Sequence, residues 1–183
     1  MAILDIETQT PCLGGRMAKR ISGLFNGYGN GRDRGELFYF TVSHIFAEPG
    51  RKIKIGNNCF IAADCSLHGP LEIGNEVAIN HHCILDGGRA GIKLHDQVRI
   101  AAYCHLYAFD HGMQLDRPLY QQPVRSQGIE IEKDVWLGAH VGIKDGIKIG
   151  KHAVVGMNSM VTKDVEPYHI VGGNPAKFIR LRE

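Results

Sequence analysis

Histidine is the residue type best suited to proton transfer near neutral pH, and one histidine of this chain stands apart from the others. The chain contains ten of them, so a histidine alone is weak evidence for chemistry. Six fall where turns or outward strand positions are expected, and we interpret them as solvated: His68, His81, His82, His95, His140 and His152. His111 instead begins the segment HGMQLDRPLYQQPVRSQG. There its imidazole would suit a general base that removes a proton from a hydroxyl group. Asp110 beside it would either orient the ring or form a turn, and His105 is the second candidate base.

Basic residues late in the chain are candidates for a different role. Lys163 lies in VTKD, and Lys177 and Arg180 lie in NPAKFIR. Such cations bind phosphate groups through charge-assisted hydrogen bonds. Basic residues near the end of a chain also commonly form a solvated face, so the sequence alone leaves both interpretations open.

The elements that would position these residues follow a six-residue repeat. Aliphatic residues recur at every sixth position in three phased runs: Ile55, Ile61, Leu67, Ile73, Ile79 and Leu85; Leu94, Ile100 and Leu106; Ile131, Leu137, Ile143, Ile149, Val155 and Val161. The fourth residue after each marker is small or apolar, and it lies two residues before the next marker. A strand places residues two apart on one face. We therefore predict a solenoid with three short strands per coil around an apolar column. Four of the five cysteines occupy this column, where we expect small buried hydrophobic residues rather than reactive thiols.

The repeat is interrupted in three places. Residues 1 to about 50 lack it; we expect a short amphipathic helix at MAKRISGLF (17–25) and a strand at ELFYFTVSHIF (36–46), packed on the end of the solenoid. The insertion at 87–93 is predicted as a loop. Residues 111–128 are predicted as a long external loop, which in a compact domain is usually functional. The chain thus divides into an N-terminal cap (1–52), a β-helix (53–172) and a basic tail (173–183) that forms a strand or helix.

Length and composition exclude several classes of protein. The 183 residues suit one ordinary domain, and a net charge of +2 with interspersed charges gives no nucleic-acid or membrane-surface footprint. No apolar run reaches the roughly 20 residues that span a bilayer, and the first residues do not resemble a signal peptide. We expect a cytoplasmic protein without membrane insertion. The cysteines form no CxxC pair, so neither a disulfide framework nor a structural zinc site is expected.

With the repeat and its interruptions established, the chain resembles the hexapeptide-repeat acyltransferases, within them the sugar O-acetyltransferases related to galactoside, maltose and colanic-acid acetyltransferases. The similarity covers residues 53–183. It is carried by IEKDVWLGAHVGIKDGIKIGKHAVVGMNSMVTKDVEPYHIVGGNPAKFIR and by YAFDHG before the long loop. It implies an all-β fold, a left-handed parallel β-helix, and a homotrimer with active sites between subunits. It further implies acetyl-CoA as co-substrate, no metal, and a hydroxyl or amine of a sugar or surface-polysaccharide precursor as acceptor.

The resemblance also implies roles for individual residues. His111 matches the family's general base, which would promote direct attack on the thioester, and Asn80 and Asp86 match acceptor-binding positions, although both are also ordinary turn formers. Trp136 lies in an outward position between two column residues and is expected to meet the pantetheine arm or a subunit interface. A backbone N–H near Ala139 would meet the thioester carbonyl. The remaining positions implied for CoA are Met157, Thr162, Lys163, Lys177 and Arg180.

Two other functions fit the same scaffold. The γ-class carbonic anhydrases bind a metal through three histidines on neighbouring subunits, two of them five residues apart, whereas His105 and His111 are six apart. A non-catalytic hexapeptide scaffold subunit would keep the coils without the chemistry, and the joint presence of His111, Trp136 and Lys163 disfavours it. The chain has no clear match to the N-terminal segment of the galactoside and maltose enzymes, which favours a surface-polysaccharide or nucleotide-sugar precursor over those substrates.

Overall fold

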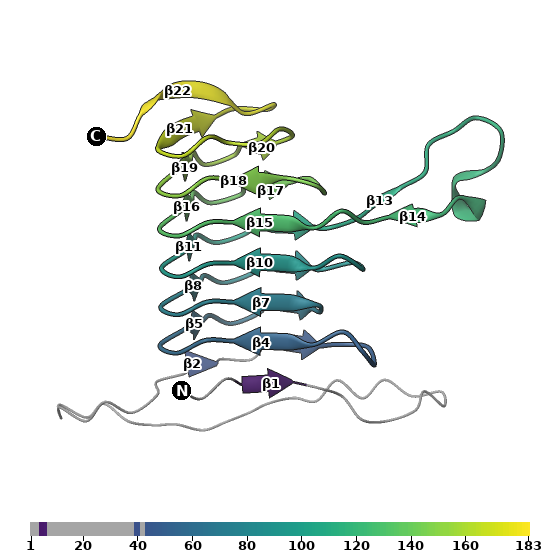
Figure 1. Cartoon of the computed structure of the whole chain (residues 1–183), viewed down its shortest axis with the longest axis horizontal. Coiled ribbons are helices and arrows are strands. Elements are labelled where there is room, and N and C mark those ends of the chain that lie inside the picture. Colours follow the sequence, from purple (N-terminus) through teal and green to yellow (C-terminus); the bar gives the residue numbers. More distant parts are fainter. Residues whose placement is uncertain (1–3, 7–38, 41–42) are drawn as a thin grey trace.

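The computed structural model of the chain describes residues 4–6, 39–40 and 43–183. Short strands stack coil upon coil into three sheets, and each coil between residues 53 and 161 gives one strand to each sheet (Figure 1). Sheet A contains β1 (Leu4–Ile6), β4 (Ile53–Ile55), β7 (Leu71–Ile73), β10 (Ile92–Leu94), β15 (Ile129–Ile131) and β18 (Lys148–Ile149). Sheet B contains β2 (Tyr39–Phe40), β5 (Phe60–Ile61), β8 (Ala78–Ile79), β11 (Arg99–Ile100), β16 (Trp136–Leu137), β19 (Val154–Val155), β21 (His169–Gly172) and β22 (Lys177–Leu181). Sheet C contains β3 (His44–Phe46), β6 (Ser66–His68), β9 (Ile84–Asp86), β12 (His105–Tyr107), β17 (Gly142–Ile143) and β20 (Met160–Val161).

The six-residue repeat explains this stack. Equivalent residues of successive coils pair in parallel, so that Ile53, Leu71 and Ile92 form one apolar row. All fifteen aliphatic markers are buried, as are Cys59, Cys65, Cys83 and Cys104. The predicted apolar column and the buried cysteines are therefore confirmed, and the fold is the parallel stack expected of the predicted left-handed β-helix.

The stack begins earlier than the repeat. Strands β2 and β3 pair in parallel with β5 and β6, ahead of residue 53. Within the segment 36–46, where one strand was expected, Tyr39–Phe40 and His44–Phe46 thus form two short strands that extend sheets B and C. Ile45 is buried between outward His44 and Phe46, but it precedes Ile55 by ten residues, so a six-residue count misses it. The helix expected at 17–25 lies outside the described residues.

Three segments depart from the regular coils: the C-terminal tail, the insertion and the long loop. Strands β21 and β22 form an antiparallel hairpin, so the basic tail is a strand. The insertion after β9 turns at residues 88–90 before β10 begins. The long loop leaves the stack between β12 and β15 and projects away from it; it carries β13 (Asp110–His111), β14 (Val124–Arg125) and a short 3-10 helix, η1 (Leu119–Gln121) (Figure 1). No helix within the described ranges is long and apolar enough to cross a membrane.

Candidate functional site

His111 lies at the point where the long loop leaves sheet C. It pairs with Val124 across the antiparallel β13–β14 ladder, and Asp110 pairs with Arg125. The imidazole is exposed. The Asp110 carboxylate lies 3.5 Å from Lys144 Nζ, and no hydrogen bond joins it to His111 among the described residues. Asp110 thus interacts with Lys144 rather than orienting the imidazole.

Two cavities meet at His111. The first, of about 520 Å³, follows the outward face of sheet C and is lined by His105, Tyr107, Phe109, Asp110, His111, Gly142, Ile143, Lys144, Asp145 and Met160. The second, of about 350 Å³, lies under the loop and is lined by Asp110, His111, Gly112, Met113, Gln114, Arg125, Gln127, Lys144 and Asp145. Phe109 makes edge contacts with Tyr107 at 5.9 Å and with His111 at 6.4 Å between ring centroids. The first cavity has an aromatic wall and the second is polar, and His111 can reach a molecule in either.

The stem of the loop is anchored by polar side chains. The buried Asp145 carboxylate accepts the Gln127 N–H at 2.9 and 3.0 Å and the Gly128 N–H at 2.9 Å. The Ser126 hydroxyl accepts the N–H groups of Arg89 and Ala90 and donates to the Ala108 carbonyl. These bonds fix where the chain leaves and re-enters the coils, and hence where β13 begins.

Several residues of this site were missed by sequence reasoning: Tyr107, Phe109, Lys144, Asp145 and Met160. Asp145 lies in KDG (144–146), directly after the column residue Ile143, and as a sequence KDG is typical of an exposed turn. The one available signal is its position in the first coil after the long loop, where the chain that returns from the loop needs hydrogen-bond acceptors. The sequence pattern does not show which residues of that coil face the stem of the long loop.

Asp86, expected to bind the acceptor, lies on the outward face of sheet C beside Tyr107. Its carboxylate is 3.3 Å from His68 Nδ1 and accepts the Gly88 N–H at 3.0 Å. The His68 ring in turn stacks on Phe46, with centroids 4.1 Å apart. Asp86 therefore forms the turn contact that the sequence left as an alternative, and it lies on sheet C, the sheet that the chain leaves just before His111.

Trp136 lies on sheet B instead, and Asn80 directly follows β8 of the same sheet. They line a cavity of about 360 Å³ together with Ala78, Arg99, Ile100 and Ala101. The Trp136 side chain is 53% exposed, which confirms its predicted outward position. This cavity shares no lining residue with the two cavities at His111, so these cavities of one chain do not bring the expected base and the expected CoA contact together.

Ala139 and Met157 lie at the corner between sheets B and C, in neighbouring coils. The Ala139 N–H has no acceptor among the described residues, whereas at the corner between sheets A and B the Asn57 and Asn75 N–H groups donate to side chains of the adjacent coil, at 2.9 and 2.7 Å. Gly138 packs closely beneath Met157, because a Cβ at Gly138 would lie 2.6 Å from the Met157 backbone nitrogen. The corner thus offers a free, rigidly held N–H donor.

The expected phosphate-binding residues lie at the C-terminal end of the stack. Thr162 and Lys163 are exposed after β20, and Lys177 and Arg180 are exposed on β22. In the described structure neither Lys163 nor Lys177 forms an ion pair, so both ammonium groups are available to an anionic ligand.

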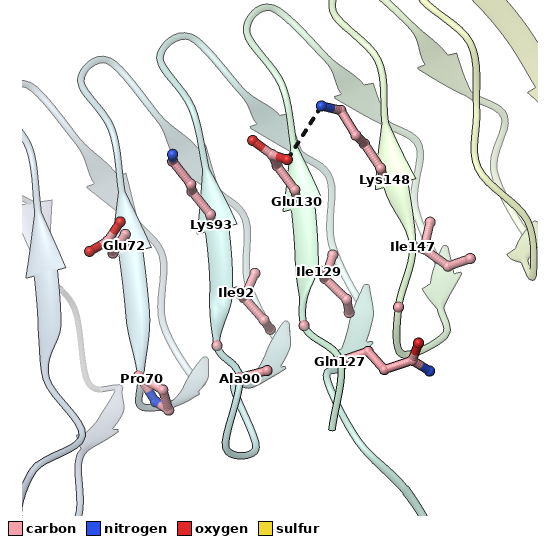
Figure 2. Close-up of a pocket in the computed structure, with 13 residues that line it drawn as sticks. Pro70, Glu72, Ala90, Ile92, Lys93, Gln127, Ile129, Glu130, Ile147 and Lys148 are labelled. Carbon is pink, nitrogen blue, oxygen red and sulfur yellow. Dashed lines mark ion pairs between the residues drawn. The ribbon is translucent and has the colours of Figure 1, made fainter. Parts of the chain in front are cut away.

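A separate cavity of about 580 Å³ lies over sheet A, and Figure 2 shows the side chains that line it. Two of its charged residues pair with each other, since Glu130 lies 3.4 Å from Lys148, and the His95 ring, outside the cavity, lies 2.8 Å from the same carboxylate. The hydrogen bond from His95, followed by the Lys148 charge, lowers the pKa of Glu130. None of the expected site residues lines this cavity. Across the described residues no three His, Cys, Asp or Glu side chains form a group that could hold a metal ion.

A family profile and several curated proteins match the chain, and all of them are described as transferases. The profile of the family "Bacterial transferase hexapeptide (six repeats)" matches residues 128–163. A chloramphenicol acetyltransferase from Escherichia coli is 38% identical over 112 residues, covering 59% of this chain and 52% of that protein. A probable macrolide acetyltransferase from Lysinibacillus sphaericus is 35% identical over 147 residues, covering 80% of this chain and 69% of that protein. The chain spans from about a quarter to about half of the length of the first curated relatives that it matches.

Solved structures similar to this chain are acyltransferases as well. AntD, an N-acyltransferase from Bacillus cereus solved with dTDP-4-amino-4,6-dideoxyglucose and coenzyme A, is 29% identical, with a TM-score of 0.67 and coverage of 80% of this chain and 83% of that one. A hexapeptide-repeat-containing acetyltransferase from Vibrio cholerae, solved with acetyl-CoA, is 32% identical, with a TM-score of 0.61 and coverage of 70% of each chain. Together with the stacked six-residue coils, these matches show that the chain belongs to the hexapeptide-repeat acyltransferase family.

Proposed function

We propose that the chain transfers an acetyl group from acetyl-CoA to a hydroxyl or amine of a small acceptor, with His111 as general base. The observation that carries this proposal is the position of His111, exposed at the junction of two cavities in a chain whose family uses acyl-CoA donors. An exposed imidazole at this position can take the proton of an attacking hydroxyl.

The reaction needs no covalent intermediate on the protein. The acceptor oxygen or nitrogen attacks the acetyl carbonyl carbon as His111 takes its proton, and a tetrahedral oxyanion forms. The C–S bond then breaks, and the proton passes from His111 to the departing CoA sulfur. The free N–H of Ala139 is the proposed oxyanion donor, a contribution of about 3 kcal/mol to transition-state stabilisation.

Acetyl-CoA is proposed to lie along the corner of sheets B and C. Trp136, Ala139 and Met157 would contact the pantetheine arm. Trp136 and Met157 are 53% and 63% exposed, so apolar surface is available to cover that arm. The phosphates would be bound by the exposed groups of the last coils: Thr162, Lys163, Lys177 and Arg180.

We propose a homotrimer with active sites between subunits. His111 and Trp136 line different cavities of one chain, so a neighbouring copy is the simplest way to bring base and thioester together. The loop also exposes large apolar side chains, at fractions of 75%, 103%, 60% and 83% for Met113, Leu115, Leu119 and Tyr120. Such a group on a projecting loop is typical of a surface covered by a partner. Sedimentation equilibrium would test the trimer.

The acceptor is proposed to be a sugar or surface-polysaccharide precursor in the cytoplasm, bound through Asn80 and Asp86 with Asp86 held by His68. A second candidate is an antibiotic such as those after which the relatives are named, because Tyr107, Phe109 and Met160 give one cavity at His111 an apolar wall. Both candidates share the base and the donor.

An acceptor screen that counts released thiol tests the function. The panel would contain maltose, dTDP-4-amino-4,6-dideoxyglucose, chloramphenicol and a macrolide, each with acetyl-CoA. We expect thiol release that depends on one class of acceptor. Failure of every acceptor, together with no binding of CoA by calorimetry, would favour a non-catalytic scaffold. Stoichiometric metal in protein purified without chelator would favour the carbonic anhydrase alternative.

A further inference from the structure

Gln122 is an exception within the long loop. Residues 113–121 are all exposed, whereas Gln122 is 7% exposed. Its neighbour Gln121 has the same side chain, but it is exposed, and among the described residues its amide bonds only to the adjacent Tyr120 hydroxyl. A buried amide is stable only when its polar atoms are paired, so the partners of Gln122 indicate what it holds together.

The Gln122 amide bonds three backbone groups of the loop. Its Oε1 accepts the Gln114 N–H at 2.9 Å, and its Nε2 donates to the Gln114 carbonyl at 2.7 Å and to the Arg117 carbonyl at 2.9 Å. The paired bonds to Gln114 reproduce what a neighbouring strand residue would give. The side chain therefore extends strand-like pairing to Gln114, three residues beyond His111 at the end of the β13–β14 ladder.

The residue next to His111, Gly112, lies against the same side chain. Gly112 is buried, its N–H donates to the Pro123 carbonyl at 3.1 Å, and a Cβ added to it would lie 2.7 Å from Gln122 Oε1. His111 thus lies between the Asp110–Arg125 pair on one side and the Gly112–Gln122 contact on the other. The loop tip has no buried apolar residue that could hold it instead.

We propose that Gln122 is a positioning residue for His111: its amide holds the outer end of the β13–β14 ladder and so fixes the direction of the imidazole. The catalytic consequence rests on the proposed function of His111, whereas the structural one does not. Gln122 itself is not proposed to touch either reactant.

Amide hydrogen exchange tests whether Gln122 holds the outer end of the ladder, and it needs no assay of turnover. In Gln122→Met, which keeps the length but removes the hydrogen bonds, we expect exchange at Gln114 and Gly112 to accelerate by about tenfold or more, because their protection requires an intact ladder. Exchange at the coil amide of Trp136, bonded to the Ala153 carbonyl, should not change. The matched control is Gln121→Met, which should leave all three amides at the wild-type rate.

Steady-state kinetics with the acceptor found in the thiol-release screen test whether Gln122 positions His111 for catalysis. In Gln122→Met we expect kcat to fall by about tenfold to a hundredfold, as for other displacements of a reacting group by about 1 Å. The KM for acetyl-CoA should stay within about twofold, since the expected CoA residues lie elsewhere. Gln121→Met should match the wild type in both constants.

Gln122→Glu adds a signature that a general loss of stability would not give. An ionised carboxylate would face the Gln114 and Arg117 carbonyls, which are both acceptors, whereas a protonated one could donate to one of them. The ratio of variant to wild-type kcat should therefore rise as the pH falls.

The outcomes separate the two ideas. If the wild type transfers acetyl groups and Gln122→Met changes neither exchange nor kcat, the positioning role is wrong. It is also wrong if exchange accelerates while kcat stays at the wild-type value. If no acceptor is acetylated but exchange at Gly112 and Gln114 still accelerates, the ladder role stands and the proposed function fails.

Discussion

The coils and the long loop are stabilised in opposite ways. In the coils, each short strand is paired in register with strands of adjacent coils, and buried residues such as Leu67, Leu85 and Leu106 fill the interior. In the loop, the tip is exposed and the stem is held by the polar side chains of Gln122, Ser126 and Asp145. The coils therefore supply stability, and the loop supplies the geometry at His111. Substitutions in the two regions should accordingly change different measurements.

The largest effect on stability is expected inside the coils. Leu67→Ala removes a fully buried side chain in β6, and the cavity left behind should lower the free energy of unfolding by about 2–5 kcal/mol. Urea unfolding measures this, with Leu115→Ala at the exposed loop tip as control, expected within about 0.5 kcal/mol of the wild type. Equal losses in both variants would contradict the contrast between the regions.

A smaller effect is expected at the loop stem. Asp145→Ala leaves the partly buried N–H groups of Gln127 and Gly128 without their acceptor, at a cost of about 1–3 kcal/mol in the stem. Hydrogen exchange at those two amides should accelerate, while coil amides keep their protection. Exchange that accelerates equally in coil and stem would show that Asp145 supports the whole fold.

A change in backbone conformation where the 87–93 insertion meets the loop stem should lower the free energy of unfolding by about 2 kcal/mol. Gly88 has φ +55, and a Cβ there would lie 2.5 Å from the Ala108 carbonyl oxygen, so Gly88→Ala is strained in both respects. Gly50 also has positive φ, +81, but a Cβ at Gly50 would have no neighbouring atom within 4 Å. The fall in Tm should be larger for Gly88→Ala than for Gly50→Ala; an equal fall would show that crowding by Ala108 is unimportant.

The smallest effect is expected from the charged outer face of sheet A. The His95 hydrogen bond, and then Lys148, lower the pKa of Glu130 below its ordinary 4.5. A carboxyl with a lowered folded-state pKa stabilises the protein fully above its unfolded value and loses this contribution as the pH falls through the folded value. Because the pair is partly exposed, the contribution is below about 1 kcal/mol. The Tm difference between wild type and Glu130→Gln should shrink from pH 6 to pH 3; a constant difference would contradict the ion pairing.

The sequence predicts the coils well because their physics is local and periodic. A six-residue spacing is enough to place Ile55, Cys59 and Ile61 inside and Trp136 outside. It fails at β2 and β3, where the spacing changes although the strands still stack. It also does not reveal Asp145 or Gln122, since their burial depends on which coil and which loop residue face them. His111 stands out in the sequence by its place at a break in the repeat, while its surroundings required the structure.

The most direct test of His111 as the base is the kinetics of His111→Ala, measured with the best acceptor from the screen. We predict that kcat falls by about 10²–10⁴-fold, as for loss of a general base, while CoA affinity by calorimetry is nearly unchanged. His105→Ala, which alters the same cavity, serves as the matched variant and should lose much less. Unchanged turnover in His111→Ala, or a larger loss in His105→Ala, would contradict the assignment of His111 as the base.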